Sequence, residues 1–479
     1  MPVSNRVRRI VLSLLLLIPC FWTARIQSTD LGSHIYNAWL TQLVKAGQAP
    51  GLELASPSTN VLFDWMLESL LGPLGPDLAQ GMAVSFAVLV FFWGAFAFLQ
   101  ALTVDGPWAL APSLAMLTYG WVFHMGLFNF YLSAGMSLVA LAGAWKGSRA
   151  GMAAALPILA LAWTAHSLPV AWAVAVFLYA RAAGALDPGR RWILAGLALM
   201  ALVAIRLFLD ARFKTVWVSL QMFGLLAVDQ VWVFGFKYYV LMIVMGILWS
   251  FLLLRLTHLS SFAGLLRQPS FQIAVLTALG VVLIPTSVNL PGRGMELSLI
   301  AERMTLLSGV VLCGVMAAAQ PLRWQRISLT AVALVYFSFL FVDTRRLDQV
   351  ESRMEHLLRG LPRGSRVVSS FYDPGSRVFL IAHTLDRACL GHCFSYGNYE
   401  PPSGWFRVRV KHDNPYVVTR GADSLAIDMG KYVVEPRDLP LYQVTLCGEE
   451  LNTMCTKPLA AGETVKSNRV FWVTPKVWW

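Results

Sequence analysis

The chain has 479 residues, of which 57% are hydrophobic and 13% charged, and its formal net charge is +12. A soluble protein carries about a quarter charged residues, so this composition excludes a wholly water-soluble protein. The excess of basic residues indicates cytoplasmic loops that face anionic lipid. Because no basic patch is interleaved with aromatic residues, we expect no nucleic-acid partner.

Apolar stretches long enough to cross about 30 Å of hydrocarbon recur through residues 1–343. We predict an all-α polytopic membrane domain over this range. Its eleven predicted transmembrane helices are 10–26, 82–103, 107–123, 128–145, 150–165, 167–183, 192–209, 237–254, 271–289, 303–319 and 327–343. The first span lacks a small-residue cleavage site after it, which favours a signal anchor over a signal peptide.

The basic residues predict the orientation of these spans. A cytoplasmic N-terminus makes every short inner connection basic, except the one around Asp105, as the positive-inside rule requires. These inner residues are Lys146, Arg149, Arg181, Arg190, Arg191, Arg255, Arg267, Arg323 and Arg326. An odd number of spans then places residues 344–479 outside the cytoplasm. Since the chain carries no organellar signal, we expect a bacterial plasma membrane protein.

The long first outer loop, 27–81, is predicted to form two short amphipathic helices joined by a Pro/Ser turn. In the first helix Asp30 and His34 are four residues apart, on one helical face. An ionised carboxylate beside an imidazole can act as a general base. The alternative is an ordinary first-turn acid with a local histidine partner. In the second helix we expect Asp64 and Glu68 to form a solvated face.

Further polar residues fall on the side of the membrane assigned to the outside. Each alone is compatible with a cap at the membrane interface, but ionisable groups gathered at helix ends are typical of a binding cavity. Together they predict a polar cavity that opens outward. The residues that we expect to bind substrate there are Asn37, His124, Asn129, His166, Lys237, Arg293, Glu302 and Arg303.

Residues 344–479 are predicted to form a small α+β extracytoplasmic domain. A polar helical segment precedes Gly360, and a second helical stretch is expected over 375–390. Alternating runs at 365–371, 406–410, 415–419 and 469–473 are typical of strands. The domain contains four cysteines, which predict two disulfides with three possible pairings: Cys389, Cys393, Cys447 and Cys455. Free thiols are the alternative, and the cysteine spacings disfavour a zinc site.

The predicted arrangement of spans, first outer loop and outer domain resembles that of the GT-C superfamily of polytopic glycosyltransferases. The likeness lies in Asp30 within TDLGSHIYNAWL, in the stretch SPSTNVLFDWMLESLLGPLGPDLAQ that enters the second span, and in the outer domain that follows the membrane body. The resemblance implies that Asp30 matches the first-loop acid, which deprotonates or positions the acceptor. It also implies that Arg303, in AERMTLLSG, binds the lipid phosphate. Asp30 is followed by Leu31 where the family has a second acid, so no metal or other cofactor is assigned.

The resemblance implies an integral-membrane glycosyltransferase with a polyprenyl-phosphate-linked sugar donor and a glycan, lipid or protein acceptor. Asp30 is its expected general base, with His34 as the partner of Asp30. Two other functions stay open. One is a lipid or solute transporter or flippase, although charges are sparse near the span centres. The other is a non-catalytic envelope assembly protein whose working part is the outer domain.

Overall fold

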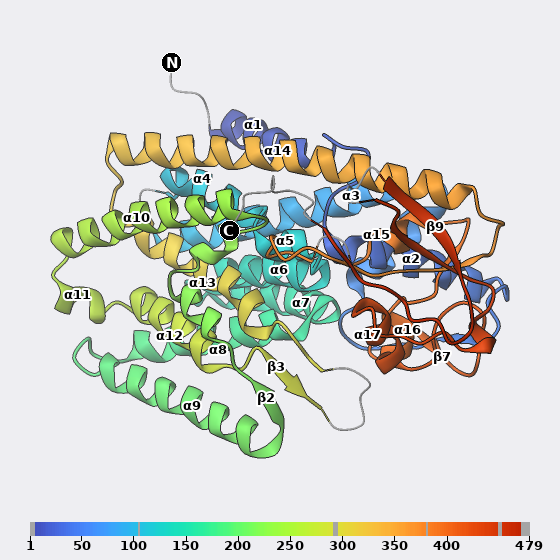
Figure 1. The fold of residues 1–479 in the computed structure, drawn as a ribbon. Coiled ribbons are helices and arrows are strands. Elements are labelled where there is room, and N and C mark those ends of the chain that lie inside the picture. Colours follow the sequence, from blue (N-terminus) through green and yellow to red (C-terminus); the bar gives the residue numbers. More distant parts are fainter. Residues whose placement is uncertain (1–4, 104–105, 291–295, 380–381, 449–452, 471–479) are drawn as a thin grey trace.

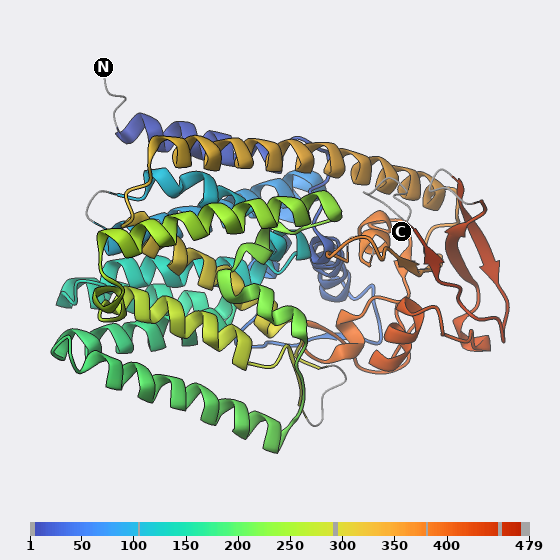
Figure 2. The same ribbon diagram turned by 60° about the vertical axis from the view of Figure 1, so that its left-hand side comes forward.

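A computed structural model describes residues 5–103, 106–290, 296–379, 382–448 and 453–470. The protein is mostly helical, with small sheets in its C-terminal part. Figures 1 and 2 show the long helices lying side by side, with the C-terminal domain packed at one end of them. The N-terminal two thirds of the chain therefore form a helical bundle with one end covered.

The bundle contains fourteen α-helices within the described residues. They are α1 (Asn5–Leu17), α2 (Thr29–Lys45), α3 (Leu62–Leu102), α4 (Ala111–Thr118), α5 (Trp121–Met125), α6 (Phe128–Ala144), α7 (Arg149–Ala165), α8 (Ser167–Ala185), α9 (Arg191–Arg212), α10 (Phe236–Leu259), α11 (Phe262–Leu266), α12 (Pro269–Leu283), α13 (Ile300–Ala317) and α14 (Arg323–Arg359). Short 3-10 helices η1 (Ile18–Cys20), η2 (Trp108–Leu110), η3 (Ser219–Leu226) and η4 (Val228–Val231) connect some of them.

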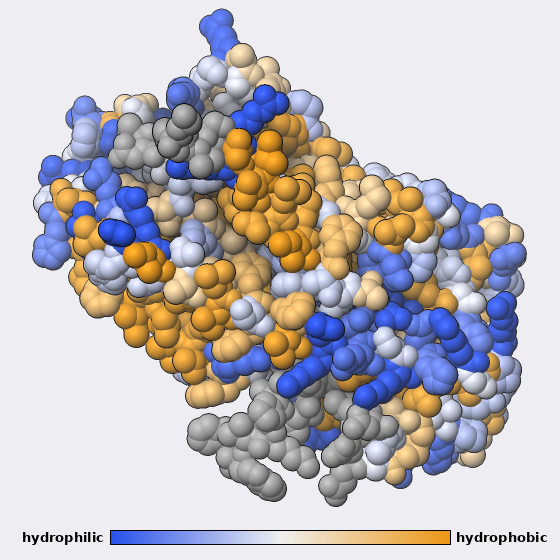
Figure 3. All heavy atoms as spheres, turned by 90° about the horizontal axis from the view of Figure 1, so that it is seen from above, coloured by the Kyte–Doolittle hydropathy of each residue, from blue (hydrophilic) through white to orange (hydrophobic). Residues whose placement is uncertain are grey.

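Six of these helices, α3, α8, α9, α10, α13 and α14, are long and apolar enough to cross a membrane. Three shorter apolar helices, α6, α7 and α12, lie among them. Helix α9 buries none of its residues, and its Trp192 and Phe208 are 69% and 61% exposed. Figure 3 shows hydrophobic residues gathered over the bundle and hydrophilic ones toward the C-terminal domain. A soluble monomer does not expose apolar surface on this scale, so the bundle is suited to lipid.

The predicted count of eleven spans is not confirmed. Within the predicted span 10–26, helix α1 ends at Leu17 and the 3-10 helix η1 begins at Ile18. Pro19 in η1 lacks the backbone N–H that a continuing α-helix needs. Over 107–123 the chain forms η2, α4 and α5, and Gly120 separates the last two. Helix α4 has eight residues, about 12 Å at the usual rise, which is too short to cross a bilayer.

Two helices are longer than the sequence indicates. Helix α3 has 41 residues and joins the second predicted short helix to the second predicted span, with one break at Gly75 (φ 74°) between Pro73 and Pro76. Helix α14 has 37 residues. It includes both the last apolar stretch and the polar segment that follows, and it extends from the bundle along the C-terminal domain (Figure 1). A change from apolar to polar composition alters what a helix contacts and does not by itself end it.

The C-terminal domain is built on a four-stranded sheet with the order β6 (Phe394–Ser395), β4 (Arg366–Ser369), β8 (Leu441–Leu446) and β9 (Met454–Leu459). Strand β4 is parallel to both neighbours, and β8 and β9 are antiparallel. The expected strand over 415–419 is wrong, and β8 and β9 were not predicted. The remaining elements are β5 (Phe371–Tyr372), α15 (Thr384–Ala388), α16 (Glu400–Ser403), β7 (Val408–Val410), α17 (Gly421–Asp428), η5 (Pro436–Asp438) and β10 (Asn468–Arg469).

Three two-stranded sheets complete the structure. Strand β1 (Leu52–Leu54), in the loop between α2 and α3, pairs with β7 of the C-terminal domain. Strands β5 and β10 pair within that domain, and β2 (Lys214–Val216) pairs with β3 (Ser287–Asn289) at the ends of α9 and α12. The β1–β7 pair ties the first long loop directly to the C-terminal domain.

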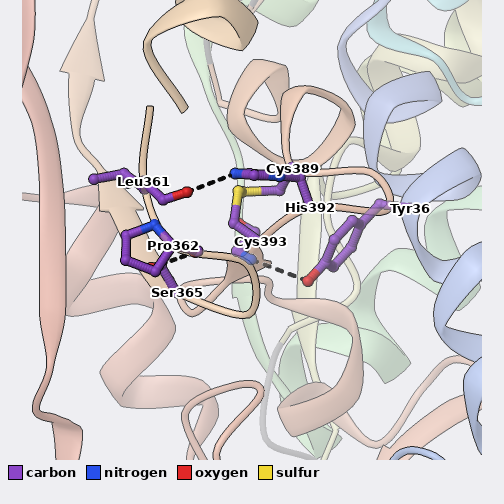
Figure 4. The surroundings of a disulfide bond; sticks show 8 residues. Tyr36, Leu361, Pro362, Ser365, Cys389, His392 and Cys393 are labelled. Atoms are coloured by element: carbon purple, nitrogen blue, oxygen red, sulfur yellow. Dashed lines mark hydrogen bonds between the residues drawn. A yellow bond between two sulfur atoms is a disulfide. The ribbon is translucent and has the colours of Figure 1, made fainter. Parts of the chain in front are cut away.

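Two disulfides form within the C-terminal domain, Cys389–Cys393 and Cys447–Cys455. Figure 4 shows the first with Tyr36 of α2 on one side and Leu361, which follows α14, on the other. There the imidazole of His392 donates through Nε2 to the Leu361 carbonyl (2.9 Å), and the Tyr36 hydroxyl accepts from the Ser395 amide (3.0 Å). This disulfide therefore staples a segment that contacts both helices.

A buried ion pair joins α15 to α14. Arg387 donates through Nε and Nη2 to the two carboxylate oxygens of Glu351, both at 2.6 Å. Its Nη1 donates to the Ile26 carbonyl (2.9 Å) and to Gln80 Oε1 (3.0 Å). The Arg387 and Glu351 side chains are 6% and 1% exposed. One guanidinium thus connects the C-terminal domain, the last helix and the start of the first loop.

We expect Arg387→Ala to destabilise the protein by about 3–5 kcal/mol, because it leaves the Glu351 carboxylate buried without its partner. Thermal unfolding in detergent and the rate of proteolysis of the C-terminal domain measure the effect. Arg359→Ala, which removes an exposed ion pair with Glu355, is the matched control and should change stability by less than about 1 kcal/mol. Equal stability of the two variants would contradict the docking role of Arg387.

Candidate functional site

Asp30, in the first turn of α2, contacts two side chains of the C-terminal domain. Its Oδ1 lies 3.3 Å from His383 Nε2 and 3.5 Å from the Tyr399 hydroxyl. The other ring nitrogen of His383, Nδ1, lies 3.0 Å from Asp386 Oδ2. The Asp30 side chain is 20% exposed and that of His383 is 13% exposed. The predicted base therefore lies at the junction of bundle and C-terminal domain.

His34, one turn further along α2, pairs with a different carboxylate. Its Nδ1 lies 2.6 Å from Asp64 Oδ1, and Asn129 Nδ2 donates to Asp64 Oδ2 (3.1 Å). Asn129 Oδ1 in turn accepts from the Phe63 amide (2.9 Å), at the start of α3. The expected Asp30–His34 pair is thus replaced by an Asp30–His383 pair and a His34–Asp64 pair.

A third carboxylate, Glu400, lies beside this pair. The Ser33 hydroxyl donates to Glu400 Oε1 (2.8 Å), and Asn37 and Asn398 exchange a side-chain hydrogen bond at 2.9 Å. Burial raises the pKa of Glu400 to about 8, with the charge of His34 opposing this shift. Burial alone would lower the pKa of His34, but the charge of Asp64 and its hydrogen bond raise it to about 9. We call this group the acid–imidazole cluster: Asp30, His34, Asp64, His383, Asp386 and Glu400.

Arg303, in the first turn of α13, lies near the cluster but is held by backbone carbonyls. Its Nε donates to the Leu299 carbonyl (3.0 Å) and its Nη2 to the Ser298 carbonyl (2.8 Å). Leu299 has a left-handed backbone (φ 59°) just before the helix, a strained conformation for a branched side chain. The charge of Asp30 acts on the Arg303 guanidinium. The two residues therefore belong to one electrostatic neighbourhood.

His166 and Arg303 present two hydrogen-bond donors to the same space. His166 caps α8, with its Nδ1 accepting from the Leu168 amide (3.2 Å). Because Nδ1 acts as an acceptor, the hydrogen of the ring must be on Nε2. His166 Nε2 lies 3.4 Å from Arg303 Nη1, so two N–H groups face each other and neither can accept from the other. We call these two residues the donor pair.

Two glycines allow the close packing around Asp30. A Cβ on Gly32 would lie 2.4 Å from the His383 carbonyl oxygen, and a Cβ on Gly126 would lie 2.5 Å from the Asp30 amide nitrogen. Gly126 also has a positive φ of 81°, which favours glycine. Without these glycines α2 could not approach both the His383 segment and the α5–α6 turn.

Several predicted substrate-binding residues have other contacts. Lys237 Nζ lies 2.7 Å from Asp343 and joins α10 to α14. Glu302 accepts from the Thr286 hydroxyl (2.5 Å). His124 contacts the Gln27 carbonyl through Nδ1 (3.0 Å), and Arg293 lies outside the described residues. In contrast, six predicted residues lie in or beside the cluster and the donor pair. They are Asp30, His34, Asn37, Asn129, His166 and Arg303.

The expectation of a solvated face at Asp64 and Glu68 is wrong. Asp64 is only 17% exposed and contacts His34 and Asn129, and Glu68 pairs with Lys45 and Arg407. The C-terminal members of the cluster were also missed as site residues. His383, Asp386 and Glu400 follow Asp30 by more than 350 residues in the sequence, so no local sequence pattern connects them to Asp30.

In the described part of the chain, no group of three or more His, Cys, Asp or Glu side chains is arranged to hold a metal ion. No protein-family model, curated protein or solved structure matches this chain.

The His34–Asp64 pair predicts a pH-dependent effect of Asp64→Asn. The pKa of His34 is raised to about 9 in the folded protein, from about 6.5 in an unfolded chain. The pair therefore stabilises the protein fully below pH 6.5, and this contribution is lost as the pH rises through about 9. We expect the variant to be less stable than the parent at pH 6.5, with the difference shrinking above pH 9.

Thermal unfolding in detergent between pH 6 and 10 measures this difference. Glu53→Gln, at an exposed position in β1, is the control and should show no such trend. A stability difference that is constant across this pH range would mean that His34 is neutral in the parent protein.

Proposed function

We propose that the protein is an integral-membrane glycosyltransferase that moves a sugar from a polyprenyl-phosphate-linked donor to an acceptor. The observation that carries the proposal is the donor pair, whose Arg303 feels the charge of Asp30. Glycosyl transfer from a phosphate requires a base for the acceptor and cationic or N–H donors for the phosphate that leaves. Asp30 is suited to the first role, and Arg303 with His166 to the second.

The donor pair favours an oxyanion as its ligand. Two N–H groups 3.4 Å apart repel each other unless a common acceptor lies between them, and a phosphate oxygen can accept from both. The remaining nitrogens of Arg303 are tied to carbonyls and not to carboxylates. Among the described residues no direct ion pair neutralises the guanidinium charge, which is therefore available to a phosphate.

The proposed reaction is a single displacement. The acceptor O–H or N–H loses its proton to Asp30, and its electron pair forms the bond to the anomeric carbon of the sugar. The bond from that carbon to the phosphate oxygen breaks, and its electron pair stays on the phosphate. The N–H groups of Arg303 and His166 stabilise this negative charge as it develops.

The distribution of basic residues supports an extracytoplasmic site. His166 and Arg303 lie at one end of the bundle helices. Four basic residues lie at the opposite helix ends, namely Lys146, Arg181, Arg191 and Arg255. Under the positive-inside rule these ends face the cytoplasm. The proposal therefore places the C-terminal domain and the candidate site on the outer side of a bacterial plasma membrane.

We expect Arg303→Gln to weaken the binding of a polyprenyl monophosphate by tenfold or more, because a charge-assisted hydrogen bond contributes about 1.5–3 kcal/mol. His166→Phe should weaken it several-fold while keeping the ring shape. Binding to purified protein in nanodiscs measures both effects. Arg212→Gln, at the exposed end of α9, is the control. Equal affinity of the parent and both site variants would remove the phosphate-binding role.

We expect Asp30→Asn to lower sugar transfer by about 10²–10⁴-fold, the usual loss when a general base is removed, while polyprenyl monophosphate still binds. A panel of radiolabelled polyprenyl-phosphate hexoses, tested in proteoliposomes with an acceptor mixture, provides the assay. Transfer by the variant at the parental rate would exclude Asp30 as the base. Movement of intact lipid across the bilayer without covalent transfer would favour a flippase instead.

A further inference from the structure

We infer that His383, supplied by the C-terminal domain, is a positioning residue that holds the Asp30 carboxylate with one oxygen open to a substrate proton. The inference rests on the proposed function and names a residue that the sequence did not assign to it. It makes the C-terminal domain a part of the transfer site.

The first step concerns the protonation of His383. Its Nδ1 lies 3.0 Å from Asp386 Oδ2 and its Nε2 lies 3.3 Å from Asp30 Oδ1. A carboxylate only accepts hydrogen bonds, and a neutral imidazole has a single N–H. Both contacts are favourable together only when both ring nitrogens carry a hydrogen. His383 is thus an imidazolium that bridges two carboxylates.

The surroundings of His383 support this charge. The groups that face it are Asp30 of α2, Asp386 of α15, Asp428 at the end of α17, and the Tyr399 ring, whose centroid lies 4.9 Å away. Burial alone would lower the pKa of His383, but the hydrogen bond and charge of Asp386, with the charges of Asp30 and Asp428, raise it to about 9.

The second step concerns the two oxygens of Asp30. His383 and the Tyr399 hydroxyl both contact Oδ1. Among the described residues Oδ2 has no hydrogen-bond partner, and it is not among the buried polar atoms that lack one. The side chain is 20% exposed. One oxygen is therefore fixed by the protein, and the other is open on the accessible side.

This division suits a general base. The acceptor proton moves to Oδ2 of Asp30 while His383 keeps both of its protons and holds Oδ1 in place. Because a base must lie within hydrogen-bond reach of the proton that it removes, a carboxylate that rotates freely is a poorer base. Loss of a ring proton above pH 9 leaves His383 with one N–H for two acceptors, and Asp30 loses its fixed orientation.

The test uses the full-length protein and the transfer assay across pH 6 to 10. We expect His383→Gln to lower kcat about 10- to 100-fold, the scale expected for a misplaced reacting group, with the KM for the lipid donor unchanged. Asp386→Asn should shift the alkaline loss of activity to lower pH, because it removes the charge that keeps His383 protonated. Asp413→Asn, 82% exposed in the same domain, should match the parent.

A spectroscopic measurement separates this inference from the proposed function. In ¹⁵N-histidine-labelled protein in detergent, the resonances lost in His383→Gln identify this ring. Two protonated nitrogens at pH 7.5, with titration near pH 9 that moves lower in Asp386→Asn, support the bridge. A single protonated nitrogen, or titration and pH–rate profiles that do not differ between parent and Asp386→Asn, overturns it. Such spectra from a parent that transfers no sugar would uphold the bridge and overturn the proposed function.

Discussion

The buried Arg387–Glu351 ion pair is the interaction on which the candidate site depends. Burying two charges is costly, and the cost is offset only when the geometry is good and the remaining donors are satisfied. Here the guanidinium binds both oxygens of Glu351 and gives its last nitrogen to Ile26 and Gln80. Because Arg387 follows His383 by one helical turn, the same contact fixes the histidine segment over α2.

The way α2 and the C-terminal domain meet explains why the site is composite. Backbone approach at Gly32 brings the His383 segment onto the first turn of α2. Two further contacts join the same parts of the chain. The Asn37–Asn398 hydrogen bond links α2 to the C-terminal domain, and the β1–β7 pair links the segment after α2 to that domain. The carboxylates of the cluster then come from α2, α3, α15 and α16, and no single element carries the site. A rigid scaffold with residues from several elements is typical of functional sites.

Hydropathy predicted the membrane-like character of the bundle but not the length of each helix. A window of apolar residues contains no information on where a helix ends, so the breaks after Leu17 and at Gly120 were missed. The last span was predicted to end at residue 343 and a separate polar helix to follow it, whereas the two form one helix, α14, up to Arg359. For the candidate site, the pattern predicted Asp30, His166 and Arg303 because they occupy the ends of apolar segments, and their roles stay predictions. Asp64 was assigned to solvent because helical spacing cannot show which tertiary surface will cover a polar face.

The charges around the site are arranged so that they do not cancel. A direct ion pair between Arg303 and Asp30 would neutralise both charges. Instead Arg303 is held by the carbonyls of Ser298 and Leu299, and Asp30 is held through Oδ1 by an imidazolium. Arg303 and Asp30 are thus each held by the protein without being paired directly with each other. The strained backbone of Leu299 is consistent with this view, because strain is retained where it positions a functional group.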